Sequence, residues 1–203
     1  MDFLLPSAWN LDTVAEVVGV ITGLLCVWLA ARQNIWTFPT ALISVFLYIL
    51  VFYKARLYAD MGLQVMFAFL NFYGWYLWLH KGSQRAERPV SRMTKQQWGW
   101  LLLFVPVFTL GLGMYLHHNT NADLAYWDSA TTAVSLGAQW LMSRKKLENW
   151  LIWIVVDAVY VPIYIYKELY PTALLYFLYL ALAWWGYIDW KKSLRAQVAN
   201  VQG

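Results

Sequence analysis

The chain has 203 residues, enough for one ordinary domain; 61% of them are hydrophobic and only 13% are charged. A soluble globular protein is about half apolar and about a quarter charged. This composition therefore excludes a soluble enzyme, a disordered tail and a nucleic-acid-binding module. The net charge of +4 does not point to nucleic acid, because the basic residues lie between apolar runs and form no basic face. We predict a single all-α transmembrane domain over residues 1–203.

Seven long apolar runs predict seven membrane-spanning helices. A helix needs about 20 mostly apolar residues to cross a bilayer core of about 30 Å. The predicted spans cover residues 13–31, 35–53, 61–79, 98–116, 128–143, 150–166 and 171–190. Asp2 and Asp12 precede the first span where a signal peptide would carry basic residues, so we expect this span to remain in the protein.

The basic residues are distributed unevenly between alternate loops, which predicts an orientation. One set of loops carries Arg32, Lys81, Arg85, Arg88, Arg92, Lys95, Arg144, Lys145, Lys146, Lys191, Lys192 and Arg195. The other set carries only Lys54, Arg56 and Lys167. Loops rich in Lys and Arg stay on the cytoplasmic side, so we predict an outer N-terminus and a cytoplasmic C-terminus. The connector 81–97 is then a solvated basic loop, and the tail after Lys191 is a short surface helix or disordered.

The two ends of the chain resemble each other at a nearly constant offset of 112 to 114 residues. The matching pairs are Trp28 and Trp140, Arg32 and Arg144, Trp36 and Trp150, Gly74 and Gly186, and Trp78 and Trp190. The repeated unit covers three spans, residues 13–79 and 128–190, and the span 98–116 links the two copies. Because a fourth helix returns the chain to its starting side, the second triplet has the same orientation as the first. The sequence thus predicts a 3+1+3 arrangement of parallel repeats, with a substrate site near the midplane between the halves. The alternative is accidental similarity between apolar, aromatic-rich segments.

The sixth span carries one aromatic and acidic face. Trp150, Trp153, Asp157 and Tyr160 have helical spacing, and Asn149 borders the same face. Polar groups deep in hydrocarbon are costly and are functional candidates by default. We interpret Asp157 as a countercharge or acceptor for a ligand; the alternative is a structural partner for a Tyr or Ser on a neighbouring helix.

The third span carries two amides on one face. Gln64, Phe67, Asn71 and Trp75 again have helical spacing, and amides offer both donors and an acceptor, which suits a sugar or a carboxamide. The alternative is helix packing through amides. Packing is also the interpretation of the polar face of the fifth span, which consists of Asp128, Thr132, Ser135 and Gln139.

No motif for a cofactor or a metal stands out. The phosphate-binding loop G-x-x-x-x-G-K-[ST] is absent from the sequence. His117 and His118 are adjacent but lack an acid or Cys at ligand spacing. We therefore predict no cofactor, no metal and no enzymatic activity; the alternative is a membrane-embedded enzyme acting on a lipid through Asp128, Asp157 and the two His residues.

Several runs match one known family. They are Tyr58-Ala59-Asp60, Leu63-Gln64, residues 71–78 (NFYGWYLW), Trp127-Asp128-Ser129 and residues 144–153 (RKKLENWLIW). With these runs the chain resembles the PnuC-type vitamin transporters from about residue 15 to 190, and Glu-Asn-Trp-x-x-Trp is the most specific part. The resemblance implies a fold similar to the full-length SWEET-like fold, a homotrimer in the lipid of the bacterial inner membrane, and facilitated diffusion of nicotinamide riboside (uniport). It also implies that a cytoplasmic kinase traps the vitamin by phosphorylation, which would commit it to NAD biosynthesis.

The resemblance also implies which residues bind the substrate. The matching positions are Gln64, Phe67, Asn71, Asn149, Trp150, Trp153 and Asp157, with Trp36 and Tyr160 as flanking aromatics. Nicotinamide riboside is a flat cation with a carboxamide and a ribose, and stacking a cationic ring on Trp contributes about 0.5–2 kcal/mol. Thiamine is also a flat cation and satisfies the same description, so it is the alternative substrate.

Overall fold

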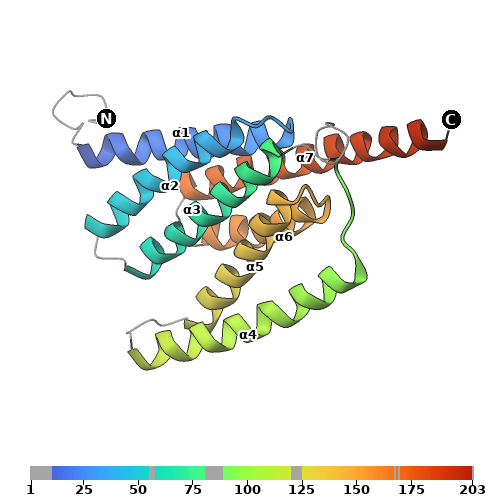
Figure 1. The fold of residues 1–203 in the computed structure, drawn as a ribbon. Helices are drawn as coiled ribbons and strands as arrows, with labels where there is room; N and C mark the ends of the chain where they lie inside the picture. The colour runs from blue at the N-terminus through green and yellow to red at the C-terminus, as the bar shows by residue number, and fades with distance from the viewer. Residues whose placement is uncertain are drawn as a thin grey trace.

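The computed structural model describes residues 11–54, 58–80, 89–119, 125–166, 168 and 170–202. These residues form seven α-helices, as predicted (Figure 1). They are α1 (Leu11–Ala31), α2 (Thr37–Lys54), α3 (Tyr58–Leu79), α4 (Lys95–Asn119), α5 (Ala125–Ser143), α6 (Glu148–Tyr166) and α7 (Tyr170–Gln202). Below, α1–α3 are the first triplet and α5–α7 the second triplet.

Helix α7 differs most from its predicted bounds. It continues to Gln202 instead of ending near Trp190, so the tail after Lys191 is neither a separate surface helix nor disordered over the described residues. Residues 191–202 include several strong helix formers and neither Gly nor Pro, so nothing in them interrupts the helix.

Two of the described helices, α2 and α4, are long and apolar enough to cross a bilayer by length and composition alone. In α1 the stretch Val17–Ala31 is apolar but shorter. The remaining helices have apolar faces interrupted by polar side chains, such as Gln64 and Asn71 in α3.

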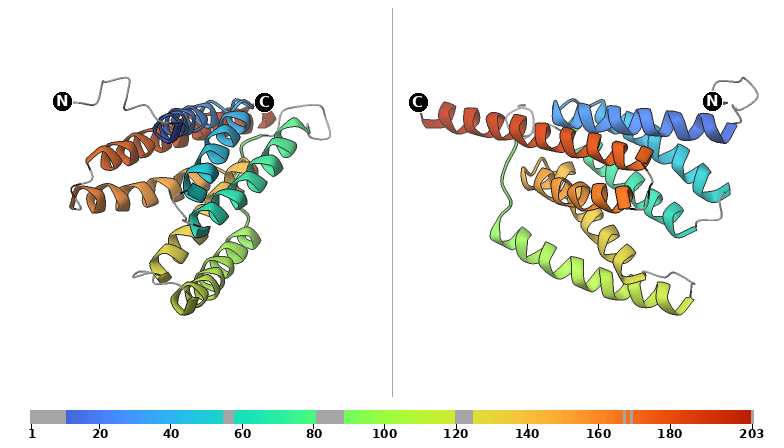
Figure 2. Two further views of the ribbon diagram at one scale, coloured as in Figure 1. Left: turned by 90° about the vertical axis from the view of Figure 1, so that its left-hand side faces the viewer. Right: turned by 180° about the vertical axis from the view of Figure 1, so that it is seen from behind.

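Six helices pack as a closed ring over the described residues. Around it, α1 contacts α2, α2 contacts α3, α3 contacts α5, α5 contacts α6, α6 contacts α7, and α7 returns to α1. Helix α4 packs chiefly against α5 and lies at the edge of the bundle (Figures 1 and 2). In Figure 1 the helices of the ring come together where α1 joins α2 and α5 joins α6, and they diverge towards the opposite end.

The turns that end α1 and α5 have the same hydrogen bonds. After α1, the N–H groups of Gln33 and Asn34 donate to carbonyl groups near the helix end, and Gln33 has a φ of 55°. After α5, Lys145 and Lys146 make the same two bonds, and Lys145 has a φ of 51°. This is the Schellman end of a helix, here with a residue other than Gly in the left-handed position. Each residue of the second turn lies 112 positions after its counterpart.

An aromatic ring packs against a glycine in the first triplet. Phe38, at the start of α2, is fully buried, and a Cβ added at Gly74 would lie 2.5 Å from its ring. The ring of Trp78 meets Phe38 edge to face at a centroid distance of 5.0 Å. Only glycine permits this close approach of α3 to the Phe38 ring.

The same packing recurs in the second triplet. A Cβ added at Gly186 would lie 2.7 Å from the ring of Trp150, and Trp190 meets Trp150 edge to face at 5.4 Å. Each of these residues again lies 112 positions after its counterpart, so Trp150 corresponds to Phe38. The pairing of Trp36 with Trp150 at an offset of 114 residues, which the sequence suggested, is therefore not the pairing that the contacts show.

The segment just before α4 is docked onto the α5–α6 turn. Ser91 accepts a backbone hydrogen bond of 2.9 Å from Leu147, and the backbone N–H of Met93 donates to the Glu148 carboxylate at 3.0 Å. The predicted solvated connector 81–97 is thus wrong for residues 91–93, because their backbone groups pair with the turn and with the first residue of α6. Residues 81–88 lie outside the described part of the chain.

Candidate substrate-binding site

A buried pair of amides joins the two triplets. Asn71 of α3 is 3% exposed, and its amide donates to the carbonyl of Phe67 at 2.9 Å. Its oxygen accepts a hydrogen bond of 3.2 Å from the amide of Gln139 on α5. Asn71, which was predicted to bind substrate, and Gln139, which was predicted to pack helices, therefore form one polar contact inside the ring.

We expect Gln139→Leu to lower the melting temperature of the protein. The substitution replaces the amide with an apolar side chain of similar size. It leaves the buried oxygen of Asn71 without its donor, which costs about 1–3 kcal/mol. The control is Thr131→Val in the same helix, because the Thr131 hydroxyl bonds only to carbonyls of α5 in the described contacts. Thermal unfolding in detergent measures both variants. Equal melting temperatures for Gln139→Leu and Thr131→Val would contradict the prediction.

The start of α6 places two polar groups in the interior. Asn149 is fully buried, and its amide nitrogen donates to the carbonyl of Lys146 at 2.6 Å. Among the described residues, the Asn149 Oδ1 and Trp150 Nε1 atoms are buried and have no hydrogen-bond partner. Buried polar atoms are almost always paired, so a free acceptor and a free donor on consecutive residues fit a ligand that offers both kinds of group.

Asp157 is buried at the middle of α6. Its side chain is 4% exposed, and no charged partner lies beside it among the described residues. A buried carboxylate without a countercharge is costly. The position therefore suits a ligand that brings a positive charge.

Tyr179 of α7 is a residue of this interior that the sequence interpretation missed. Its hydroxyl lies 2.9 Å from where a Cβ of Gly23 would be, and Asp157 of α6 and Tyr48 of α2 are near it. Tyr179 lies seven residues before Gly186, two helical turns away on one face of α7. Extending the Gly186 face towards the start of the helix would have found it.

The other predicted binding residues have different surroundings. Gln64 and Phe67 are half-buried on α3, and Phe67 packs against a small core of Leu42, Val45 and Ala68. Trp153 is half-buried against the core that contains Phe38, Trp150 and Trp190. Trp75 packs against both cores and so connects the α3 and α6 residues.

Two predicted aromatics lie outside these cores. The Tyr160 ring is 5.1 Å from the Tyr176 ring, between α6 and α7. Trp36 is 64% exposed in the turn before α2. The structure thus brings Asn71, Asn149, Trp150 and Asp157 into the interior and leaves Trp36 at the surface.

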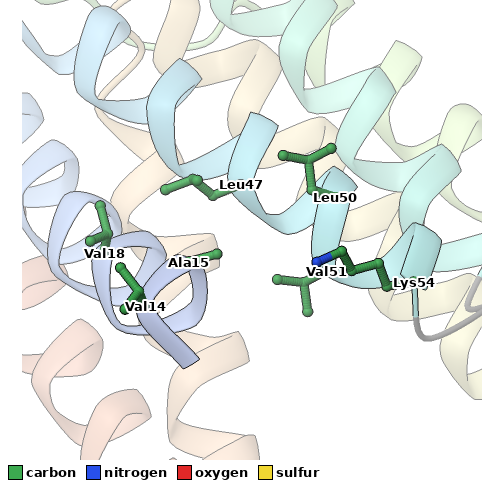
Figure 3. A pocket seen from close by; sticks show the side chains of 7 residues that line it. All are labelled: Val14, Ala15, Val18, Leu47, Leu50, Val51 and Lys54. Carbon is green, nitrogen blue, oxygen red and sulfur yellow. The ribbon is translucent and has the colours of Figure 1, made fainter. Parts of the chain in front are cut away.

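Two surface grooves lie apart from these residues. One, of about 390 Å³, runs between α1 and α2 and is lined by aliphatic side chains, with Lys54 at the end of α2 (Figure 3). The other, of about 330 Å³, lies between α4, α5 and α6 and is lined mainly by Trp98 and aliphatic residues. No predicted binding residue lines either groove. The candidate site is therefore defined by the buried polar groups inside the ring.

A family model described as nicotinamide mononucleotide transporter matches residues 13–192. Among curated relatives, the nicotinamide riboside transporter PnuC of Escherichia coli (strain K12) is 32% identical over 89% of this chain and 86% of its own length. The nicotinamide riboside transporter PnuC of Neisseria mucosa is 30% identical over 92% of this chain and 75% of its own. The riboflavin/roseoflavin transporter RibM of Streptomyces davaonensis is 27% identical over 87% of this chain and 84% of its own length.

A solved structure is also similar. The crystal structure of the vitamin B3 transporter PnuC superposes with a TM-score of 0.73 at 29% identity. The match covers 92% of this chain and 84% of that chain. The likeness therefore extends over almost the whole seven-helix fold.

Proposed function

This chain belongs to the nicotinamide mononucleotide transporter family and is a multi-pass bacterial membrane protein, and we propose that it transports nicotinamide riboside by facilitated diffusion. The observation that carries the choice of substrate is the buried Asp157, which has no charged partner among the described residues. A cationic vitamin supplies the missing charge. The proposal is for a transporter rather than an enzyme, because the matched relatives are named as transporters.

Polar groups at the start of α6, about two helical turns from Asp157, match the uncharged parts of nicotinamide riboside. Nicotinamide riboside carries a carboxamide, which can donate to the free Asn149 oxygen, and ribose hydroxyls, which can accept from the free Trp150 N–H. Trp153 supplies an aromatic face for the cationic ring. Gln64, Phe67 and Asn71 belong to the same proposed site from the α3 side, and Tyr160 and Trp36 are its proposed outer aromatics.

Thiamine is the second candidate, because it is also a flat cation that Asp157 can balance. The riboflavin transporter RibM belongs to the matched relatives, but riboflavin is uncharged and leaves a buried carboxylate without a countercharge. The charge of Asp157 therefore favours the two cationic vitamins over a flavin.

We propose that transport occurs by movement of the two triplets against each other, in a 3+1+3 fold of the SWEET-like kind. The contacts that recur at an offset of 112 residues support parallel repeats over 13–79 and 128–190, with 98–116 as the link. The packing of the ring also supports them, since α1 contacts α7 just as α5 contacts α3.

The proposal extends to the setting of the protein. It places the chain in the inner membrane with an outer N-terminus and a cytoplasmic C-terminus, where a vitamin kinase phosphorylates the substrate and draws uptake inward. It also includes a homotrimer. Large apolar side chains on the outside of α4, such as Leu102 and Val107, suit contact with lipid or with another copy.

Uptake by proteoliposomes that contain the purified protein tests the proposed function. We expect saturable uptake of labelled nicotinamide riboside, and a roughly 2- to 30-fold loss of affinity in Trp153→Ala, because the variant lacks the stacking surface for the cationic ring. Trp184→Ala is the control, since Trp184 is exposed on α7. Transport of neither nicotinamide riboside nor thiamine by the unmutated protein would overturn the proposal.

A further inference from the structure

Two indole N–H groups cross between the triplets in the same way. Trp78 of the first triplet donates to the carbonyl of Ser143 in the second, at 3.1 Å. Trp190 of the second triplet donates to the carbonyl of Ala30 in the first, also at 3.1 Å. The two indole rings lie 6.2 Å apart. We name these four residues the indole latch.

The latch uses carbonyl acceptors at the ends of two helices. Ala30 and Ser143 belong to the last turns of α1 and α5, where carbonyl groups lack the usual N–H donor four residues further along the helix. The Ala30 carbonyl accepts both the Trp190 N–H and the Gln33 N–H of the turn that follows α1. Each donor lies on the third helix of one triplet and each acceptor on the first helix of the other. The latch therefore closes both junctions between the triplets, α3 with α5 and α1 with α7.

Two basic residues reinforce the same junctions. The Arg144 guanidinium donates to the Tyr73 hydroxyl at 2.8 Å across the α3–α5 junction. Arg32 lies over the Trp185 ring at 5.8 Å across the α1–α7 junction. These two pairs also differ by 112 positions. Both junctions are thus held at one end of the ring, the end where its helices come together in Figures 1 and 2.

We propose that Trp78 and Trp190 are the gating residues of this transporter, and that both crossed bonds must break before substrate passes the latch end of the ring. A single hydrogen bond of this kind stabilises a protein only modestly, because water replaces the partner when it breaks. Two such bonds can therefore close and reopen during each transport cycle. The inference rests on the proposed function for its role in transport, but the opening itself can be measured without substrate.

Cys26 is a natural reporter of opening. It is the single cysteine of the chain, it lies one turn before Ala30 on α1, and its side chain is half-buried. Its thiol lies 3.1 Å from the carbonyl of Gly23, the residue that the Tyr179 hydroxyl approaches from α7. A thiol reagent added to the purified protein will modify Cys26 faster when the latch is open.

The first test measures this labelling rate in Trp78→Phe, Trp190→Phe and the double variant. Phenylalanine keeps an aromatic ring but lacks the N–H, so we expect each single variant to label roughly 2 to 10 times faster and the double variant to label faster still. Trp184→Phe is the matched control on the exposed face of α7. Labelling of the folded double variant at the unmutated rate would overturn the proposal.

The second test locks the latch end without removing either Trp. Gln33 donates to Ser193 at 2.8 Å beside the latch, across the α1–α7 junction. We expect a short bis-methanethiosulfonate reagent, which spans the gap that the longer Gln33 side chain bridges, to cross-link Gln33→Cys/Ser193→Cys in a Cys26→Ala background. The cross-link should stop uptake, and reduction should restore it. Failure to cross-link would contradict the closed latch, and full uptake by the cross-linked protein would contradict gating there. A protein that transports neither vitamin would overturn the proposed function, while the Cys26 labelling rates would still decide whether the latch opens.

Discussion

Replacing Gly186 with alanine is expected to lower the melting temperature more than any other single methyl addition to the described helices of the ring, except at Gly74. The added Cβ would lie 2.7 to 2.8 Å from three atoms of the Trp150 ring, which is 2% exposed and meets the Trp190 ring at a centroid distance of 5.4 Å in the closed packing. Overpacking a rigid core costs about 1–3 kcal/mol, and we expect a value at the upper end. Thermal unfolding in detergent, followed by the loss of the monodisperse chromatographic peak, measures the effect.

Because the same packing recurs in the first triplet, the prediction for Gly186 has a counterpart at Gly74. Gly74→Ala should destabilise the protein comparably, because its Cβ would lie 2.5 Å from the Phe38 ring and 2.8 Å from the Ser143 hydroxyl. Gly111→Ala in α4 is the matched control, since no heavy atom lies within 4 Å of the added Cβ. Alanine also favours a helix interior by about 1 kcal/mol over glycine. If Gly74→Ala and Gly186→Ala melted no lower than Gly111→Ala, the tight aromatic packing would be refuted.

The helices could be predicted because apolar runs of bilayer length leave few alternatives to helix. Their ends were less predictable. The Schellman turns at Gln33 and Lys145 adopt a left-handed conformation without glycine, so the usual sequence signal for the end of α1 and α5 is missing. The docking of Ser91 onto the α5–α6 turn was also unpredictable, because it uses backbone groups that every residue has.

The part of the candidate site that depends on the cost of placing polar side chains in lipid could be predicted from the sequence. Asn71, Asn149 and Asp157 are polar residues in apolar spans, and all three are buried in the structure. Helical spacing identified a face of α6 that is buried or half-buried in the structure, but it could not say which helix that face meets. Trp150 accordingly packs on Gly186 rather than facing open space, and Tyr179 was missed because its neighbours come from α1, α2 and α6.

Asp157→Asn should weaken the binding of nicotinamide riboside by roughly 30- to 1,000-fold, which corresponds to about 2–4 kcal/mol for the loss of one partner of a buried charge pair. Asparagine has almost the same shape as aspartate, so the variant removes charge and little else. Asp128→Asn is the control, because Asp128 is exposed in the first turn of α5. Equilibrium binding to the purified proteins and competition for uptake in proteoliposomes both measure the loss.

The reduced form of the ligand separates charge from every other role of Asp157. Dihydronicotinamide riboside keeps the carboxamide and the ribose but has no positive charge on its ring. If Asp157 balances the charge of the substrate, the unmutated protein should prefer the oxidised cation, and Asp157→Asn should lose most of that preference. If Asp157 only packs helices, the substitution should weaken both forms equally, because both make the same contacts apart from the charge. An unchanged preference for the cation in Asp157→Asn would therefore show that another group recognises the positive ring.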